Sequence, residues 1–228
     1  MDIARSLADV PLFASVELSV LRALASHAQV IERKKRQSVI RQGAPADAIF
    51  AVVRGNVKVS IQSPSGSAAG LSVLGRGDVF GELGVLGAVT RLAALTALED
   101  TTLLRIPGAV FLDALSTSPI LGLSLSRLLA YRLRSTGEHF SDFAALPAPA
   151  RFAQRLLSLL ERFGQAQKTH VLLDLPLTQL DLAELAQLSR QRTNLLLQDL
   201  KRRGIIAWQD RRLVVLDIES LRTEALGL

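Results

Sequence analysis

The stretch GDVFGELGVLGAVTRLAAL, which runs from Gly77 to Leu95, decides the fold. Its four glycines surround one carboxylate, Glu82, and one guanidinium, Arg91. A tight Gly-Glu-Leu turn exposes backbone N–H groups, which can form an anion-binding concavity. An arginine nine residues later can return across that turn as a planar fork suited to a phosphate. A carboxylate can accept hydrogen bonds from a sugar hydroxyl, so the pair predicts sugar-phosphate recognition. The alternative is a glycine-rich turn with an incidental ion pair.

The composition is that of a globular protein and excludes several kinds of site. Of 228 residues, 49% are hydrophobic and 21% charged, enough for one large or two modest domains. There is no cysteine, which removes disulfides, thiolate zinc sites, iron–sulfur clusters and cysteine nucleophiles. The first residues lack the order of a signal peptide, and no apolar run reaches membrane-spanning length. We therefore expect a cytoplasmic protein with no membrane partner.

Positive charge is concentrated near the C-terminus. The net charge is +6 overall, and residues 190–212 hold seven Lys or Arg against two Asp. A focused patch of this kind is typical of a nucleic-acid footprint. A second basic run, residues 33–36, is more typical of a solvated strand edge.

Residues 29–107 predict an antiparallel barrel or jelly roll. Their hydrophobic period is two, with glycines and prolines as punctuation, and two short helices are expected before them in residues 5–28. Strands are expected at residues 49–53, 57–61, 71–74 and 103–106. Arg54-Gly55-Asn56 is a hairpin signal between the first two strands.

Helical periodicity resumes near Phe111 and continues to about Ala145, before the proline-rich hinge at residues 146–149. Spacings of four and three residues mark a heptad seam on this segment: Leu129, Leu133, Thr136, Phe140 and Phe143. The seam favours a parallel helix pair at a homodimer interface. The alternative is that it packs on the barrel.

The C-terminal third contains a helix-turn-helix pattern. An amphipathic helix at residues 151–163 is followed by Thr178, which with Asp181 forms an acidic capping box, and by a second N-cap at Ser189. Gly204 stops the second helix. Gln187 replaces the usual glycine of the turn, so the turn must tolerate a left-handed or altered residue there. Residues 205–216 read as a wing hairpin with Trp208 as a core wedge.

Two motifs together resemble a known family. Phe80-Gly81-Glu82-Leu83, followed by Arg91 and a pair of alanines, resembles the phosphate-binding cassette of cyclic-nucleotide-binding domains. With the long helix and the helix-turn-helix, the chain resembles the cyclic-AMP receptor protein/FNR superfamily of bacterial transcription regulators. The resemblance implies an α+β fold: a β-roll (jelly roll) effector domain at 1–110, a dimerisation helix at 111–146 and a winged helix-turn-helix at 147–228. The FNR branch needs cluster cysteines, which are absent, and the three histidines are outside the pocket stretch, so haem sensing is unsupported.

The resemblance implies a small-molecule effector, with a cyclic nucleotide, cyclic AMP first, as the candidate ligand. The ligand-binding residues it implies are Phe80, Gly81, Glu82, Leu83, Arg91, Leu92 and Thr136. Leu92 departs from the family, which has Ser or Ala there, and Gly137 stands where the family has a second base-contacting residue. The alternative is a ligand-independent regulator whose vestigial pocket is filled by Leu92. An inward Leu92 would make Arg91 pair with Glu82, whereas one turned into the core would leave the site available.

For DNA, the resemblance implies that residues 189–200 enter the major groove of a pseudo-palindromic site as part of a homodimer. Arg190 suits guanine, Gln191 and Asn194 suit adenine, and Leu195 is expected to pack rather than meet a thymine methyl. The DNA-binding residues it implies are Thr178, Ser189, Arg190, Gln191, Arg192, Asn194 and Lys201. RNA polymerase is a further candidate partner. An enzyme is disfavoured, because no nucleophile and no histidine–carboxylate spacing accompanies Glu82 and Arg91, and no metal cluster is evident.

Overall fold

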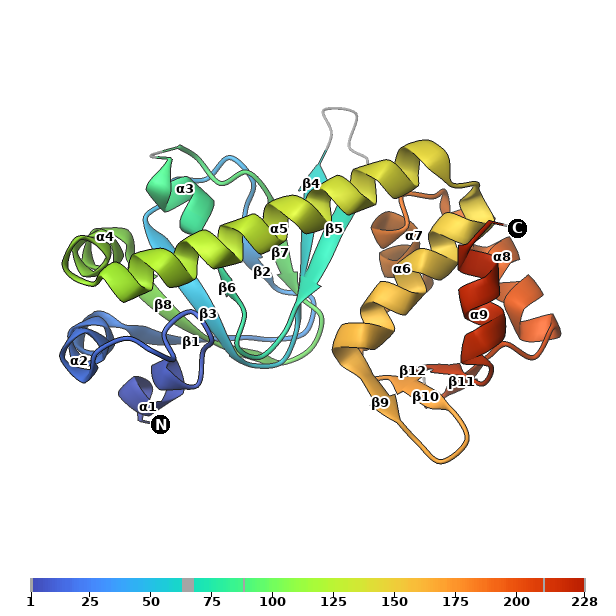
Figure 1. Cartoon of the computed structure of the whole chain (residues 1–228), viewed down its shortest axis with the longest axis horizontal. Coiled ribbons are helices and arrows are strands. Elements are labelled where there is room, and N and C mark those ends of the chain that lie inside the picture. The colour runs from blue at the N-terminus through green and yellow to red at the C-terminus, as the bar shows by residue number, and fades with distance from the viewer. Residues whose placement is uncertain (1, 63–67, 88, 211, 228) are drawn as a thin grey trace. The chain divides into compact units, whose positions relative to one another are not determined.

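The computed structural model describes residues 2–62, 68–87, 89–210 and 212–227. Internal contacts divide the chain into two compact units, Met1–Ser67 with Ser72–Thr136 and Ala68–Leu71 with Gly137–Leu228. The boundary between Thr136 and Gly137 lies inside one long helix, α5 (Pro119–Ala145), which Figure 1 shows as a continuous coil. The predicted limits of the dimerisation helix remain a prediction.

The first unit is built on two four-stranded sheets that share a core. One sheet has the order β1-β8-β3-β6 and the other β2-β7-β4-β5. Apolar side chains from both sheets meet between them, among them Phe50, Val57, Leu95 and Leu103. The strands are β1 (Gln29–Arg33), β2 (Ser38–Ile40), β3 (Ala48–Arg54), β4 (Val57–Gln62), β5 (Ala68–Leu74), β6 (Val79–Phe80), β7 (Ala94–Ala97) and β8 (Thr101–Pro107).

The hairpin predicted at Arg54-Gly55-Asn56 is wrong. β3 pairs antiparallel with β8 and β6, whereas β4 pairs with β7, so the chain crosses from one sheet to the other at this turn. Gly55 allows the crossing because its φ is +81° and a Cβ there would lie 2.6 Å from the Thr101 hydroxyl oxygen. β3 and β4, which follow each other in sequence as the strands of a hairpin would, therefore lie in the two different sheets of the roll.

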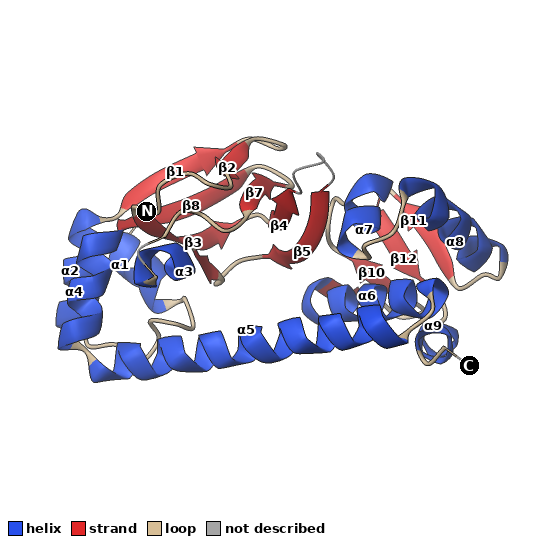
Figure 2. Ribbon diagram, turned by 90° about the horizontal axis from the view of Figure 1, so that it is seen from above, coloured by secondary structure: helices blue, strands red, loops and turns tan. Residues whose placement is uncertain are grey.

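Helices cover one end of the sheets and close a second core. They are α1 (Ile3–Ala8), α2 (Leu18–His27), α3 (Glu82–Leu86) and α4 (Gly108–Thr117), and Figure 2 shows α1, α2 and α4 gathered at that end. Fully buried Phe13 and Phe111 lie in this core with residues of β3, β8 and the start of α5. The helix predicted from Phe111 onward is two helices, because the chain bends by 113° between α4 and α5.

The second unit contains the predicted helix-turn-helix and wing. Its helices are α6 (Ala148–Phe163), α7 (Gln179–Leu185), α8 (Arg190–Arg202) and α9 (Ile218–Ala225). A four-stranded sheet of order β11-β12-β10-β9 accompanies them: β9 (Gly164–Ala166), β10 (Val171–Leu173), β11 (Ile206–Gln209) and β12 (Arg212–Val215). Strands β9 and β10 and helix α9 had no sequence prediction. The wing turn includes Arg211, which lies outside the described residues.

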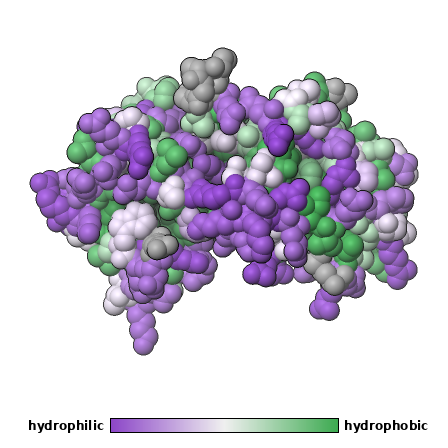
Figure 3. All heavy atoms as spheres, turned by 180° about the vertical axis from the view of Figure 1, so that it is seen from behind, coloured by the Kyte–Doolittle hydropathy of each residue, from purple (hydrophilic) through white to green (hydrophobic). Residues whose placement is uncertain are grey.

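Among the described residues, no single helix is long and apolar enough to cross a membrane. The bent pair α4–α5 passes that test by length and composition only. Phe111 of α4 and Leu121 of α5 are fully buried in the helix–sheet core, so this pair has the apolar content of core helices. On the face drawn in Figure 3, hydrophilic residues predominate and hydrophobic ones form small separate patches.

Candidate effector and DNA-binding sites

The guanidinium of Arg91 is buried and held by the protein itself. Its Nη1 donates to the carbonyl oxygen of Gly81 at 3.0 Å, and its Nη2 donates to that of Ala48 at 2.7 Å. Nη2 also lies 3.4 Å from a carboxylate oxygen of Asp47, and the guanidinium carbon lies 5.5 Å from the centre of the Phe50 ring. Arg91 is therefore fixed at the wall of the β-roll before any ligand arrives.

Asp47 balances the positive charge of Arg91 and also pairs with a second arginine, Arg105. Its other carboxylate oxygen accepts a hydrogen bond from Arg105 at 2.6 Å. Partial burial would raise the pKa of Asp47, but Arg105 and Arg91 lower it below its ordinary value. Burial lowers the pKa of Arg91, and Asp47 opposes that change. A phosphate approaching Arg91 would meet a cation that already has a carboxylate beside it.

Glu82 begins α3 and is also buried, with one oxygen paired and one free. Its Oε1 accepts from Arg132 Nη1 at 2.5 Å, and Arg132 also donates to the backbone oxygen of Val79. Its Oε2 has no hydrogen-bond partner among the described residues. A buried carboxylate oxygen without a partner is costly, so a hydroxyl group able to donate to it would be stabilising.

Gly81 lies between the two charged side chains: it precedes Glu82 in the chain, and its carbonyl oxygen contacts Arg91. It caps α3 with a φ of +88°, a conformation that favours glycine, and a Cβ would lie 2.6 Å from Arg91 Nη1. The carbonyl oxygen of the same residue accepts from Arg91. The glycine is therefore required both by the turn and by the close approach of the guanidinium.

The structure brings together three of the predicted ligand residues, Gly81, Glu82 and Arg91. Phe80 is buried, with its ring stacked on that of Phe50 at 5.2 Å between centroids. The exposed Thr136 donates its hydroxyl hydrogen to the carbonyl oxygen of Arg132, one turn earlier in α5, and Leu83 is exposed.

Sequence reasoning missed two residues, Asp47 and Arg132. The only sequence signal for Arg132 was its place one helical turn before Thr136. No comparable signal marked Asp47, which is 44 residues away from Arg91. Among the described residues, no group of three or more His, Asp or Glu could hold a metal ion.

Leu92 takes neither of the two orientations considered from the sequence. Its side chain is 56% exposed, so it neither fills the site nor enters the core. The Arg91–Glu82 pair expected for an inward Leu92 does not form: Arg91 pairs with Asp47, and Glu82 pairs with Arg132. The physical reason is that residues 92–93 form a bend before β7 begins, where strand alternation does not apply.

The helix-turn-helix has the predicted local chemistry. The Thr178 hydroxyl accepts from the backbone N–H of Asp181 at 3.2 Å, and the Asp181 carboxylate accepts from that of Thr178 at 2.8 Å. Gln187 has a φ of +53°, which confirms the left-handed turn residue. The Ser189 hydroxyl caps α8 by accepting from the N–H of Arg192, and Gly204 ends it with a φ of +73°.

Helix α8 has one buried and one exposed face. Thr193, Leu197 and Leu200 are buried, whereas the predicted base- or phosphate-contacting side chains are exposed or half-buried. The exposed ones are Thr178, Ser189, Arg190, Gln191, Arg192 and Lys201, and Asn194 is half-buried. Apart from Thr178, which caps α7, these residues lie on α8 or at its N-cap, and a single helix of this kind fits a major groove.

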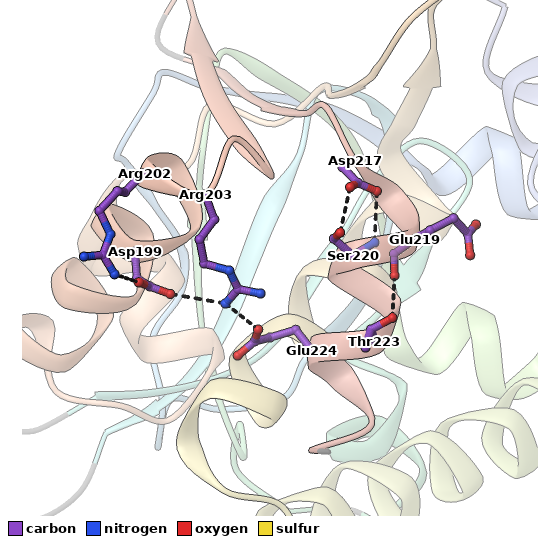
Figure 4. A network of polar contacts seen from close by, with 8 residues as sticks. All are labelled: Asp199, Arg202, Arg203, Asp217, Glu219, Ser220, Thr223 and Glu224. Carbon is purple, nitrogen blue, oxygen red and sulfur yellow. Dashed lines mark hydrogen bonds and ion pairs between the residues drawn. The ribbon is translucent and has the colours of Figure 1, made fainter.

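The C-terminal end of α8 is tied to α9 by charge pairs, as Figure 4 shows. Arg203 bridges Asp199, at 3.2 Å, and Glu224, at 2.6 Å, and Arg202 contacts the other carboxylate oxygen of Asp199 at 2.5 Å. Hydrogen bonds from Arg202 and Arg203 lower the pKa of Asp199. The network fixes the far end of α8 while Lys201 remains exposed.

Two packing predictions in this unit are wrong. Leu195, expected to pack, is 53% exposed, because it lies on the side of α8 opposite Thr193 and Leu197. Trp208, expected to be a core wedge, is 36% exposed on β11, where its strand partner is Leu213 of β12. Helix periodicity puts Leu195 on an outward face. Trp208 shares its face of β11 with buried Ile206, but it lies one residue from the end of the strand and is incompletely covered there.

Two family models match the chain in order. The cyclic nucleotide-binding domain matches residues 30–118, and the Crp-like helix-turn-helix domain matches residues 150–224. Together they cover most of the chain. The chain belongs to the cyclic-AMP receptor protein/FNR superfamily of transcription regulators.

Individual superfamily members match nearly end to end. The CRP-like cAMP-activated global transcriptional regulator of Mycobacterium tuberculosis is 29% identical over 96% of this chain and 98% of its own length. The cAMP-activated global transcriptional regulator CRP of Salmonella typhimurium is 27% identical over 83% of this chain and 90% of its own. These proteins are regulators, so the resemblance drawn from the sequence is confirmed.

Solved structures agree with the fold. The Thermus thermophilus Catabolite Activator Protein is 27% identical, covers 96% of this chain and 99% of its own, and has a TM-score of 0.53. The c-di-GMP responsive global regulator CLP of Xanthomonas campestris has a TM-score of 0.76 at 21% identity, over 87% of this chain and 99% of its own. The predicted α+β class is thereby confirmed, with the β-roll, the long helix and the helix-turn-helix in the family order.

Proposed function

We propose that this superfamily member binds pseudo-palindromic DNA as a homodimer through α8 and that its β-roll takes a cyclic nucleotide, with cyclic AMP the first candidate. The protein's role as a DNA-binding regulator follows from its family. The identity of the effector, the bases read and the residues that read them are the new content of the proposal.

The observation that carries the effector is the unpartnered Oε2 of Glu82. This buried oxygen lies on the residue next to Gly81, whose carbonyl oxygen accepts from Arg91. A cyclic nucleotide offers a ribose hydroxyl, which can donate to Glu82, and an anionic phosphate, which suits Arg91. Because Asp47 already faces Arg91, we expect the affinity for cyclic AMP to be weak.

A second candidate is a regulator that needs no ligand. It is favoured by a specific observation, namely that Arg91 and Glu82 already have charged protein partners, Asp47 and Arg132. Such internal pairs would keep the β-roll folded with its site empty. The exposed Leu92 gives this candidate no support, because its side chain does not fill the site.

A calorimetric titration with cyclic AMP, cyclic GMP and cyclic di-GMP separates the two candidates. We expect heat with cyclic AMP, and weaker binding by Glu82→Gln, which removes the anionic acceptor but keeps its volume. Glu32→Gln, at an exposed carboxylate of β1, serves as the control and should bind as the wild type does. No heat with any of the three, together with undiminished DNA binding, would establish the ligand-independent candidate.

The DNA half of the proposal distinguishes base contacts from phosphate contacts. Arg190→Ala should cost about 1–3 kcal/mol and relax the preference at one base pair of each half-site, because a bidentate guanine contact is lost. Lys201→Ala, at the other end of α8, should weaken specific and random DNA alike and lower the salt dependence. Fluorescence anisotropy against salt measures both. Equal loss on specific and random DNA for Arg190→Ala would remove it from base reading.

We infer the remaining partners from the same family. The relatives named as cAMP-activated regulators support RNA polymerase as a further partner. Action on DNA supports a cytoplasmic location. Co-purification of the polymerase with the DNA-bound dimer would test the first inference.

A further inference from the structure

An apolar side chain occupies the middle of the outward face of α8. Each residue turns an α-helix by about 100°, so the residues opposite buried Thr193 and Leu197 are 191, 195, 198 and 202. In sequence these are Gln191, Leu195, Gln198 and Arg202. Leu195 is therefore flanked by a glutamine one turn before it and another one turn after it.

The exposure of Leu195 is not explained by packing within the unit. Its side chain is 53% exposed, although the helix core is supplied by Thr193, Leu197 and Leu200. A leucine on an otherwise polar helix face does not improve solubility and cannot form hydrogen bonds. A single exposed leucine is ordinary on a protein surface, but this one is at the centre of the face that the helix-turn-helix presents to the major groove.

We propose that Leu195 reads a thymine in each half-site through its C5-methyl group. This rests on the proposed DNA binding by α8. The major-groove edges of guanine, adenine and cytosine present hydrogen-bonding groups, which a leucine cannot satisfy and would desolvate. Thymine also presents its O4 acceptor, but its C5-methyl is the one alkyl group in that groove, so a leucine pressed against the bases buries the most apolar surface at a T·A pair.

Polar residues flank Leu195 on the same face of α8 and can hold the helix against the DNA. Gln191 and Gln198 are both exposed and each carries a donor and an acceptor, so they can bond to bases or phosphates on either side of the leucine. Arg202, at the end of the same face, is anchored at 2.5 Å to Asp199. Arg203 also ties that end of α8 to Glu224 of α9, so the C-terminal end of the helix is anchored within the unit.

The test begins with the protein's own preferred site. Full-length protein selects duplexes from a random library, once with and once without cyclic AMP. Each thymine of the selected half-site is then replaced, in turn, by deoxyuridine, which lacks only the C5-methyl group and keeps the base pair. We expect one position per half-site where this replacement weakens binding about four-fold, the value of burying one methyl group.

The variants assign that effect to the side chain. Leu195→Ala should bind the thymine and deoxyuridine duplexes equally at that position. Leu216→Ala truncates another exposed leucine of the same unit, outside the helix-turn-helix, and should keep the four-fold difference. Gln191→Ala should also keep the four-fold difference between thymine and deoxyuridine, which would show that the difference does not come from a glutamine contact.

Each failure has a distinct meaning. If no sequence is selected with or without cyclic AMP, the proposed DNA binding itself is wrong and the leucine contact with it. If a site is selected but no thymine is sensitive to deoxyuridine, or Leu195→Ala retains the sensitivity, the thymine contact is overturned while the regulator stands.

Discussion

At the scale of single residues, the candidate effector site holds two buried charges, Arg91 and Glu82, that already have ion-pair partners. Arg91 and Glu82 lie near each other along the chain, yet each has its ion pair with a residue far away, Asp47 or Arg132. Asp47 is 64% exposed and Arg132 27%, so each pair has one buried member, and removing the outer partner leaves that buried charge uncompensated. A ligand bound here would therefore replace or extend existing contacts.

Leu92 gives the sharpest residue-scale prediction. Because its side chain is 56% exposed, Leu92→Ser should change the free energy of unfolding by only about 0.5 kcal/mol or less, and should neither create nor abolish nucleotide binding. Calorimetry of the variant against cyclic AMP, beside the wild type, is the measurement. If the serine variant binds a nucleotide that the wild type does not, Leu92 blocks the site in solution.

At the scale of elements, one arginine joins three helices of the second unit. Arg155 of α6 donates through Nε to the carbonyl oxygen of Leu185, at the end of α7, at 2.7 Å. Its Nη1 lies 2.8 Å from Nε2 of His139 on α5. The guanidinium can only donate, so this geometry requires a neutral imidazole nitrogen as acceptor.

The second prediction follows from this contact. Burial, then the charge of Arg155, lowers the pKa of His139, against smaller opposing effects of Asp142 and Glu138. Since the unfolded chain binds this proton more readily, the contribution to stability is full above about pH 6.5 and is lost as the pH falls from there toward the lower folded pKa. The midpoint of thermal unfolding should decrease over that range.

His139→Gln should remove this part of the pH dependence, because the glutamine oxygen can still accept from Arg155 but does not titrate. His170→Gln is the control, since that residue contacts Thr169 rather than Arg155. Parallel pH profiles for the wild type and His139→Gln would show that the contact does not control stability.

Also at the element scale, the helix caps and the turn of the helix-turn-helix were predictable from the sequence, whereas the pairing of the strands was not. The capping box, the Ser189 cap and the left-handed Gln187 depend on residues within a few positions of each other, so the sequence contains the whole cause. The Gly55 turn was misread because a hairpin and a sheet-to-sheet crossing have the same local signal. Their difference lies in the partner strands β7 and β8, some 40 to 50 residues later.

The same limit applies to the candidate site. Gly81, Glu82 and Arg91 were predictable because they lie in one short motif. The partners Asp47 and Arg132 are 44 and 50 residues away from Arg91 and Glu82 in sequence, and only the folded β-roll brings them together. The exposure of Leu195 likewise depends on which face of α8 packs, which composition alone does not determine.

At the scale of the whole molecule, the remaining prediction is that two copies of the chain form a homodimer through α5. Four of the five residues of the predicted seam are apolar, and two of them, Leu133 and Phe140, are 76% and 72% exposed. Leu129, by contrast, packs partly against the helix–sheet core. A row of exposed apolar residues at heptad spacing along one helix is typical of a coiled-coil interface.

The last prediction tests that interface in solution. The wild type should sediment at twice the 24.6 kDa chain mass, because two copies of α5 bury Leu133 and Phe140 against each other. Leu133→Arg should give monomers, since a parallel pair would bring two like charges together at one level of the seam. Leu123→Arg adds the same charge to the same helix at an exposed leucine outside the seam, and should remain dimeric. Loss of the dimer should also abolish binding to the selected pseudo-palindrome while leaving weak binding to a single half-site. A wild type that sediments as a clean monomer, or a Leu133→Arg variant that stays dimeric, would place the interface elsewhere than on this seam.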